Sequence, residues 1–548
     1  TVYDRKDLQK TGTSRFQCGI SEAEFKPENS DKSGSINPPS IQTTSGTLLR
    51  TYRLALAATA EYTIFQGGTK PLALSAMTTT MNRVNGIYNR DVTVRFNIVA
   101  NTDVIIYTAN PDPYTNGNAS AMMGENQSTV DGNIGAANYD IGHVFGTNSG
   151  GVVSGRVCTN GNKARGVTGS GAPSGDPFDV DYVAHEMGHQ CNAPHTWNGT
   201  QSNCSAGQYI SSAAVEPGSG ITIMGYAGIC GSDDLAPNSI DHFHNKSQLD
   251  IISFTQTGSG NTCGTGTATG NTAPSLSISS PTSRTIPIST PYELIGSATD
   301  ANGDALTYCW EQFDLGASGP PNVASRTDGP ITRSFSPTAS GTRTVPQLSD
   351  ILAGTSTIGN LLGTATRSMN YRFTARDNRA GGGGMTDGTF TFNVTSTAGP
   401  FLITSHNSTL VYAKNQPTTI TWSVANTNVA PVNCTSVAIL LSTDGGLTFP
   451  ITLSSSTAND GSETVTMPDV NTTTARIKVK ALNNIFFDIS NQNIQIQDYC
   501  KALGSICSDI DFGQHFISRV RLNSLDVTSS CSPNAYSLSS STTALTTG

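Results

Sequence analysis

The sequence predicts a multidomain chain in which an α/β domain is followed by all-β sandwich domains. With 548 residues the chain is too long for a single hydrophobic core. Only 13% of the residues are charged, against roughly 25% in average proteins. Gly, Ser, Thr and Asn replace them, which is typical of strands joined by many turns. Helical spacing of apolar residues is found before residue 260, and short alternating strands follow after residue 273.

Residues 1–48 form a segment without a core of their own. They are polar and rich in Ser, Pro and Lys, and almost no apolar periodicity is present. The chain begins at Thr1 without Met or an apolar signal region. From this we expect a secreted protein whose signal peptide has been removed.

Residues 49–264 alternate between strand and helix patterns. One helix places Met77, Met81, Val84 and Ile87 on the same face. Asp176 and Pro177 are typical of a helix start. Strands are expected at residues 49–60, 92–99, 139–145 and 151–158, and helices at residues 72–88, 126–137, from 176 onwards and at 244–254.

Residues 265–272 are expected to be a Gly- and Thr-rich linker, and β domains follow it. Residues 273–397 alternate as short strands and predict an immunoglobulin-like β-sandwich. Residues 398–497 repeat this pattern and predict a second immunoglobulin- or fibronectin-like sandwich. Residues 498–548 predict part of a third small β module.

One turn of the first sandwich carries three oxygen-bearing side chains at alternate positions. They are Asp300, Asn302 and Asp304. Such a turn could bind calcium, which prefers carboxylate and carbonyl oxygens. A plain Asn-Gly hairpin turn is an equally good reading of the same residues.

The strongest chemical signal is a pair of histidines in the helix that starts at residue 176. His185 and His189 are four residues apart and therefore share one helix face, where two imidazoles can bind one zinc ion. Glu186 lies one residue further round and suits a general base. Asn192 tolerates the left-handed conformation that ends a helix, so the chain can turn back and bring His195 in as a third ligand.

This stretch resembles the metzincin zinc peptidases, whose pattern is HExxHxxGxxH followed by a Met-turn. Asn192 stands at the glycine of that pattern, and residues 221–226 look like the Met-turn, with Met224 below the ligands. A chance pair of helical histidines is the alternative for HExxH alone. The order of elements and residues 216–219 resemble the bacterial reprolysin-like (adamalysin-type) family over residues 49–264.

The resemblance implies a twisted mixed sheet with helices, one zinc ion and hydrolysis of peptide bonds by a zinc-bound water that Glu186 activates. It also places Tyr226 near the metal, where it could bind zinc at rest or stabilise the oxyanion. Ordinary packing beside the Met-turn is the alternative for Tyr226. The strand at residues 151–158 would lie near the cleft and could pair with an extended substrate.

The 11 cysteines are scattered without a CxxC motif, which favours disulfides in a secreted protein. The resemblance implies the pairs Cys158–Cys263 and Cys204–Cys230. Cys18 is similar to the propeptide cysteine that keeps several metzincin groups latent, because a thiolate can occupy the open zinc position. A disulfide, for example with Cys191, is the alternative for Cys18.

Together these features predict a secreted zinc metalloendopeptidase that acts on protein or peptide substrates, with its own N-terminal segment as inhibitor. The net charge of −9 without a basic run argues against nucleic-acid binding. No apolar stretch reaches the roughly 20 residues of a membrane span. An adhesin or binding protein with a vestigial peptidase domain is the alternative, although an intact Glu186 argues against it. His242 and His244 are expected to be surface or core residues rather than a second metal site.

Overall fold

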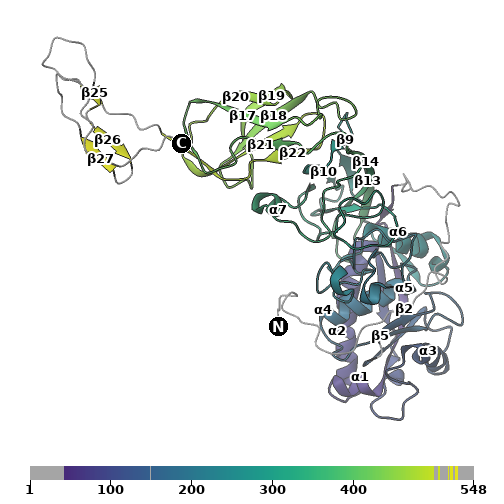
Figure 1. Ribbon diagram of the computed structural model, residues 1–548. Coiled ribbons are helices and arrows are strands. Elements are labelled where there is room, and N and C mark those ends of the chain that lie inside the picture. The colour runs from purple at the N-terminus through teal and green to yellow at the C-terminus, as the bar shows by residue number, and fades with distance from the viewer. Residues whose placement is uncertain are drawn as a thin grey trace, which may run out of the picture. The chain divides into compact units, whose positions relative to one another are not determined.

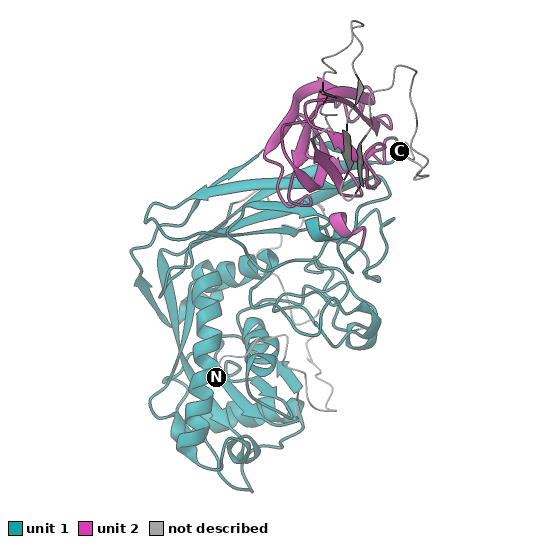
Figure 2. Cartoon of the chain, turned by 90° about the vertical axis from the view of Figure 1, so that its left-hand side faces the viewer, with its two compact units in different colours: residues 1–350, 356–397 teal, residues 351–355, 398–548 magenta. Residues whose placement is uncertain are grey.

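The computed structural model describes residues 42–498 except 149, 206 and 280, together with four short strands between residues 504 and 528. The chain divides into two compact units (Figure 2). Residues 1–350 and 356–397 form the first unit, and residues 351–355 and 398–548 form the second. The first unit contains both the α/β domain and the first β-sandwich.

The α/β domain is built on a six-stranded mixed sheet (Figure 1). The strand order is β3-β2-β4-β6-β5, and β7 also pairs with β2. Strands β2, β3, β4 and β6 are parallel, whereas β5 runs antiparallel to β6 at the edge. Their bounds are β2 (Leu48–Ala58), β3 (Val94–Ile98), β4 (Ile141–Gly146), β5 (Gly150–Val153), β6 (Gly166–Gly169) and β7 (Thr265–Ala268).

The helices of this domain lie close to their expected positions. The predicted 72–88 helix is α2, capped by Thr69 and started by Pro71, and it buries the predicted apolar face. The helix expected at 126–137 starts earlier because Asn118 caps it. The helices are α1 (Ala60–Phe65), α2 (Lys70–Val92), α3 (Ala119–Asn133), α4 (Asp176–Phe178), a π-helical turn (Asp179–Ala184), α5 (His185–Gln190), α6 (Asn245–Ile252) and a second π-helical turn (Ser253–Thr257).

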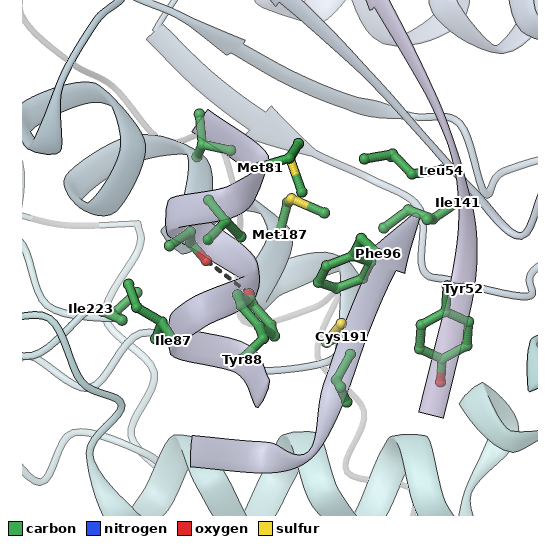
Figure 3. Packing of buried hydrophobic residues seen from close by; sticks show 14 of the residues in the cluster. Tyr52, Leu54, Met81, Ile87, Tyr88, Phe96, Ile141, Met187, Cys191 and Ile223 are labelled. Atoms are coloured by element: carbon green, nitrogen blue, oxygen red, sulfur yellow. Dashed lines mark hydrogen bonds between the residues drawn. The ribbon is translucent and has the colours of Figure 1, made fainter. Parts of the chain in front are cut away.

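The main core lies between α2, α5 and the sheet (Figure 3). Met81 of α2 and Met187 of α5 belong to the same buried cluster as Phe96 of β3. Tyr88 donates its hydroxyl to the carbonyl of Ala184 at 2.8 Å, which is the dashed line in Figure 3. This bond joins the end of α2 to the residue just before His185, so the core fixes the helix that carries the histidines.

The first half of the linker predicted at residues 265–272 is a strand instead. Residues 265–268 form β7, which pairs antiparallel with Leu48–Thr51 of β2. All four residues of β7 are exposed, so apolar alternation could not signal the strand. The predicted boundary at residue 48 is also too late, because Thr44–Ser45 forms β1 and pairs with β14 of the first sandwich.

Both predicted disulfides of this domain are confirmed. Cys158 and Cys263 are bonded, as are Cys204 and Cys230. Cys191, Cys309 and Cys434 are buried free thiols. No helix in the described ranges is long and apolar enough to cross a membrane.

Residues 273–397 form the predicted β-sandwich. One sheet has the order β1-β14-β13-β11 with β9 on β14, and the other has the order β12-β10-β8. The sheets face each other, because the ring of Phe373 on β13 lies against Gly296 on β10. The bounds are β8 (Ser275–Ile278), β9 (Thr285–Pro287), β10 (Tyr292–Thr299), β11 (Thr307–Gln312), β12 (Thr342–Val345), β13 (Arg367–Arg376) and β14 (Met385–Thr395), and α7 (Leu348–Ala353) follows β12.

The outer face of the larger sheet packs against the α/β domain. Arg376 of β13 pairs with Asp91 of α2 at 3.2 Å, and both side chains are fully buried. Glu311 of β11 accepts from the backbone N–H of Asn245 at 2.8 Å and pairs with His242 at 3.1 Å. Burial would raise the pKa of Glu311, but the neighbouring histidines and Arg376 outweigh it and hold this pKa well below its usual range. Separating the two domains would leave these buried charges unpaired, which is costly.

The second unit contains the second predicted sandwich. One sheet has the order β15-β17-β20, and the other has the order β16-β23-β21-β18-β19 with β22 on β21. Phe401 and Phe486 meet edge to face in its core, and the indole N–H of Trp422 donates to Asn459. The bounds are β15 (Leu402–Ile403), β16 (Val411–Ala413), β17 (Pro417–Ser423), β18 (Ser436–Ser442), β19 (Ile451–Ala458), β20 (Ser462–Thr466), β21 (Thr472–Ala481), β22 (Phe487–Ile489) and β23 (Ile494–Gln497). Most of the predicted third β module lies outside the described residues.

Candidate metal centre

The helix that carries the histidines starts and ends where the sequence predicts. Pro177 lies in its first turn, and a π-helical turn leads directly into His185. Asp179 accepts from the hydroxyl of Thr80 at 2.7 Å, and burial raises the pKa of Asp179 to about 6. The helix ends at Gln190, and Asn192, two residues later, has the expected left-handed φ of 69°. This turn reverses the chain and brings His195 back beside the helix.

The three imidazoles converge on one point. Nε2 of His189 lies 3.0 Å from Nε2 of His185 and 3.1 Å from Nε2 of His195. The Nδ1 atoms of His185, His189 and His195 lie 2.7, 2.7 and 3.0 Å from the carbonyl oxygens of Ile223, Ala193 and Gln208, respectively. Because a carbonyl oxygen only accepts, each Nδ1 carries the proton and each Nε2 presents a lone pair.

The chemistry of this donor set fits a zinc ion. All three rings are buried, and burial together with the neighbouring imidazoles lowers the pKa of His189 and of His195 well below the ordinary value. The rings of His189 and His195 are therefore neutral, which is the form that binds metal. Three lone pairs that face one another at about 3 Å repel unless a cation lies between them. His185, His189 and His195 would hold that cation.

Glu186 lies in the same buried site, against the edge strand β5. A Cβ atom built on Gly151 of β5 would come within 1.9 Å of Oε1 of Glu186. The carboxylate therefore occupies the space that any larger residue at position 151 would need. The strand predicted at 151–158 ends at Val153, and within the described ranges β5 has a strand neighbour on one side only. The role of Gly151 as clearance for Glu186 was not predicted.

The predicted Met-turn lies beneath the histidine helix. Met224 is fully buried, and its sulfur would come within 2.5 Å of a Cβ atom built on Gly188, which lies between His185 and His189. The carboxylate of Glu216 holds the turn by accepting from the hydroxyl of Thr196 at 2.6 Å and from the N–H of Ile221 at 2.9 Å. The sequence showed Glu216 only as part of a resemblance, because a buried carboxylate that binds backbone N–H groups has no periodic signal.

Tyr226 lies beside the histidines, as the resemblance implies. Its ring centroid is 4.6 Å from that of His195 and 5.7 Å from that of His185. Its hydroxyl donates to Oε1 of Gln208 at 2.6 Å. The ring also packs on Trp197 at 5.3 Å, so a packing role and a chemical role are both consistent with this position.

The structure adds one carboxylate to the predicted calcium turn and leaves another predicted site untested. The ligand atoms of Asp300, Asp304 and Asp377 lie within 4.8 Å of one another. Oδ1 of Asn302 accepts from the N–H of Thr272 at 2.8 Å. Cys18 lies outside the described residues.

One part of the chain matches a known family of metallopeptidases, which agrees with the geometry of the three histidines. Residues 48–255 match the family described as reprolysin-like metallopeptidases, family M12B. No curated protein matches the chain significantly. Solved structures with some likeness include the chicken CNTN1 FN1–FN3 domains, with 14% identity, 42% of this chain and 67% of that chain covered and a TM-score of 0.12. The N-terminal four Ig domains of Dscam1 isoform 1.9 match with 10% identity, 42% and 47% coverage and a TM-score of 0.12.

Adding one methyl group at position 151 tests whether Glu186 needs the space that Gly151 leaves open. We predict that Gly151→Ala displaces the Glu186 carboxylate and lowers kcat/KM for peptide cleavage by about 100-fold, as a displacement of about 1 Å can do. The zinc content should stay at the wild-type level, because the three imidazoles are not touched. Gly124→Ala is the control, since a Cβ atom on Gly124 in α3 meets nothing within 4 Å. Wild-type kcat/KM in Gly151→Ala would contradict the prediction.

Proposed function

Because residues 48–255 match the family model of the reprolysin-like metallopeptidases, family M12B, we propose that the chain is a secreted zinc-dependent endopeptidase of this family. A peptidase domain of this family implies protein or peptide substrates. The observation that carries the proposal is the convergence of the Nε2 atoms of His185, His189 and His195 in a helix that also presents Glu186. Two disulfides in the same domain support secretion, because disulfides persist in oxidising compartments.

Each residue has a distinct role in the proposed reaction. Zinc, when bound, would supply a Lewis acid that polarises the scissile carbonyl and makes water a better nucleophile. Glu186 takes the proton of the attacking water and returns it to the leaving amine. The hydroxyl of Tyr226 stabilises the negative charge that develops on the carbonyl oxygen. The edge of β5 that faces away from β6 pairs with the extended substrate and aligns it over Glu186.

The role of Glu186 can be separated from metal binding. We predict that Glu186→Gln keeps one zinc per chain and lowers casein cleavage by about 100- to 10,000-fold, the usual contribution of a general base. Atomic absorption and a casein assay measure the two quantities. Glu125→Gln on α3, which changes an exposed carboxylate that accepts from Thr115, is the control. Cleavage by Glu186→Gln at the rate of this control would rule out the assigned base.

We also propose that Cys18 keeps the enzyme latent by binding the zinc through its thiolate. We predict that Cys18→Ala raises casein cleavage by the intact chain, and that a chain starting at Gln42 is equally active. The shortened chain keeps Thr43, whose N–H donates to Asp387, and so retains β1. Unchanged cleavage in Cys18→Ala, with a normal thiol count, would count against latency.

The acidic cluster of the first sandwich supports a calcium site formed by Asp300, Asp304 and Asp377. We predict that calcium at 100 times its Kd stabilises the chain by about 2.7 kcal/mol, and that this gain is lost in Asp300→Asn. Thermal unfolding at fixed zinc measures the effect. An identical melting temperature with calcium and with a chelator would show that residues 300–304 form a plain hairpin turn that does not bind calcium.

A further inference from the structure

Gln208 holds two groups of the metal centre at once. Its backbone carbonyl oxygen lies 3.0 Å from Nδ1 of His195, and its side-chain Oε1 accepts from the hydroxyl of Tyr226 at 2.6 Å. The partner of a ligand's second ring nitrogen fixes the tautomer and the orientation of that ring. A shift of Gln208 would therefore move a metal ligand and the neighbouring phenol together.

The residue next to Gln208 is anchored by the first β-sandwich. The hydroxyl of Tyr209 donates to the carbonyl oxygen of Gly316 at 2.6 Å. The ring of Tyr209 packs on Trp197 with centroids 6.2 Å apart. Gly316 lies just after β11, in the loop of residues 315–329. The sandwich therefore supplies the acceptor of the Tyr209 hydrogen bond.

The same loop clamps the segment that follows His195. Asn198 is fully buried. Its Nδ2 donates to the carbonyl oxygens of Ala317 and Gly316 at 3.1 and 3.3 Å, and its Oδ1 accepts from Nη1 of Arg326 at 3.0 Å. The N–H of Gly319 donates to the backbone oxygen of Asn198 at 2.8 Å. Asn198 thus makes four hydrogen bonds to the sandwich loop only three residues after a metal ligand.

The loop has internal bonds that make it a firm support. The N–H of Ala317 donates to the carboxylate of Asp328 at 3.0 Å, and the N–H of Gly329 donates to the carbonyl of Leu315 at 3.1 Å. Arg326 also donates to the carbonyl oxygen of Ala317. Both ends of the loop are therefore tied together, and Gly316 is held in place for Tyr209.

We infer that the first β-sandwich is a working part of the peptidase. Its 315–329 loop fixes Asn198 and Tyr209, and through Gln208 it orients His195 and Tyr226. This inference rests on the proposed peptidase function. Asn198, Gln208 and Tyr209 are positioning residues, because they act on the site through other side chains and do not contact the reacting atoms.

Removing single contacts from the full-length chain that carries Cys18→Ala tests the inference, because that substitution removes the proposed inhibition. Tyr209→Phe deletes only the hydroxyl that reaches Gly316, and it should lower kcat by about 10- to 100-fold with less than a twofold change in KM. The cobalt-substituted protein should show a changed visible absorption spectrum, because the orientation of His195 changes. Tyr292→Phe is the control: it deletes a buried hydroxyl that bonds Tyr371 inside the same sandwich, and it should leave kcat and the spectrum unchanged.

A second variant separates the effect of the Gln208 side chain from that of its backbone carbonyl. Gln208→Ala removes the amide that holds Tyr226 but keeps the backbone carbonyl that faces His195. It should lower kcat about tenfold, within the range for such partners, and leave the affinity for zinc unchanged. Tyr209→Phe should weaken zinc binding as well, which competition with a chelator measures.

The outcomes distinguish this inference from the proposed function. Wild-type kcat and a wild-type cobalt spectrum in folded Tyr209→Phe would overturn the inference. If the Cys18→Ala chain and the chain starting at Gln42 both bind zinc but cleave no peptide, the proposed function fails. The cobalt spectrum and the zinc affinity of Tyr209→Phe would then still decide whether the sandwich orients His195.

Discussion

The metal centre depends on where three buried imidazoles carry their protons. His185, His189 and His195 each direct Nδ1 at a backbone carbonyl, and this leaves all three Nε2 lone pairs pointing at one another. A single ring with its proton on Nε2 would put a hydrogen where a cation belongs. The fold therefore has to deliver three carbonyl oxygens to three fixed places, and each comes from a different segment.

Each of these carbonyls is fixed by a different device. The carbonyl of Ala193 is delivered by the left-handed turn at Asn192, which reverses the chain immediately after the helix. That of Ile223 belongs to the Met-turn, which the buried carboxylate of Glu216 holds through backbone N–H groups. The carbonyl of Gln208 lies in a segment whose neighbours are anchored on the first sandwich. One carbonyl is therefore placed by a local turn, the second by a buried carboxylate, and the third by contacts with the first sandwich.

The sequence predicted the first of these devices well. The spacing of His185 and His189, the stop at Asn192 and the return of His195 are all local, and local patterns are what a sequence shows. Strand β3 and helix α2 were equally readable, because their apolar residues follow the period of the element.

Apart from the two disulfides, which the family resemblance implied, the contacts between distant segments were not predicted. Gly151 acts by lacking a side chain, and only the structure shows that Glu186 fills the space. Strand β7 is exposed on every residue, so it resembled a linker. Asp377 joins Asp300 and Asp304 from another strand connection, 73 residues further along the chain than Asp304. The packing of the first sandwich on the α/β domain depends on buried pairs such as Arg376 with Asp91, and no pattern within one segment reveals its partner.

The identity of the atoms that bind the metal tests the central claim most directly. X-ray absorption spectroscopy of the zinc-loaded chain would count the ligands and separate nitrogen, at about 2.0 Å, from sulfur, at about 2.3 Å. We expect one zinc per chain with three imidazole nitrogens, and His189→Ala should abolish this signal. Zinc bound with fewer than three imidazoles, or bound equally well by His189→Ala, would contradict the account.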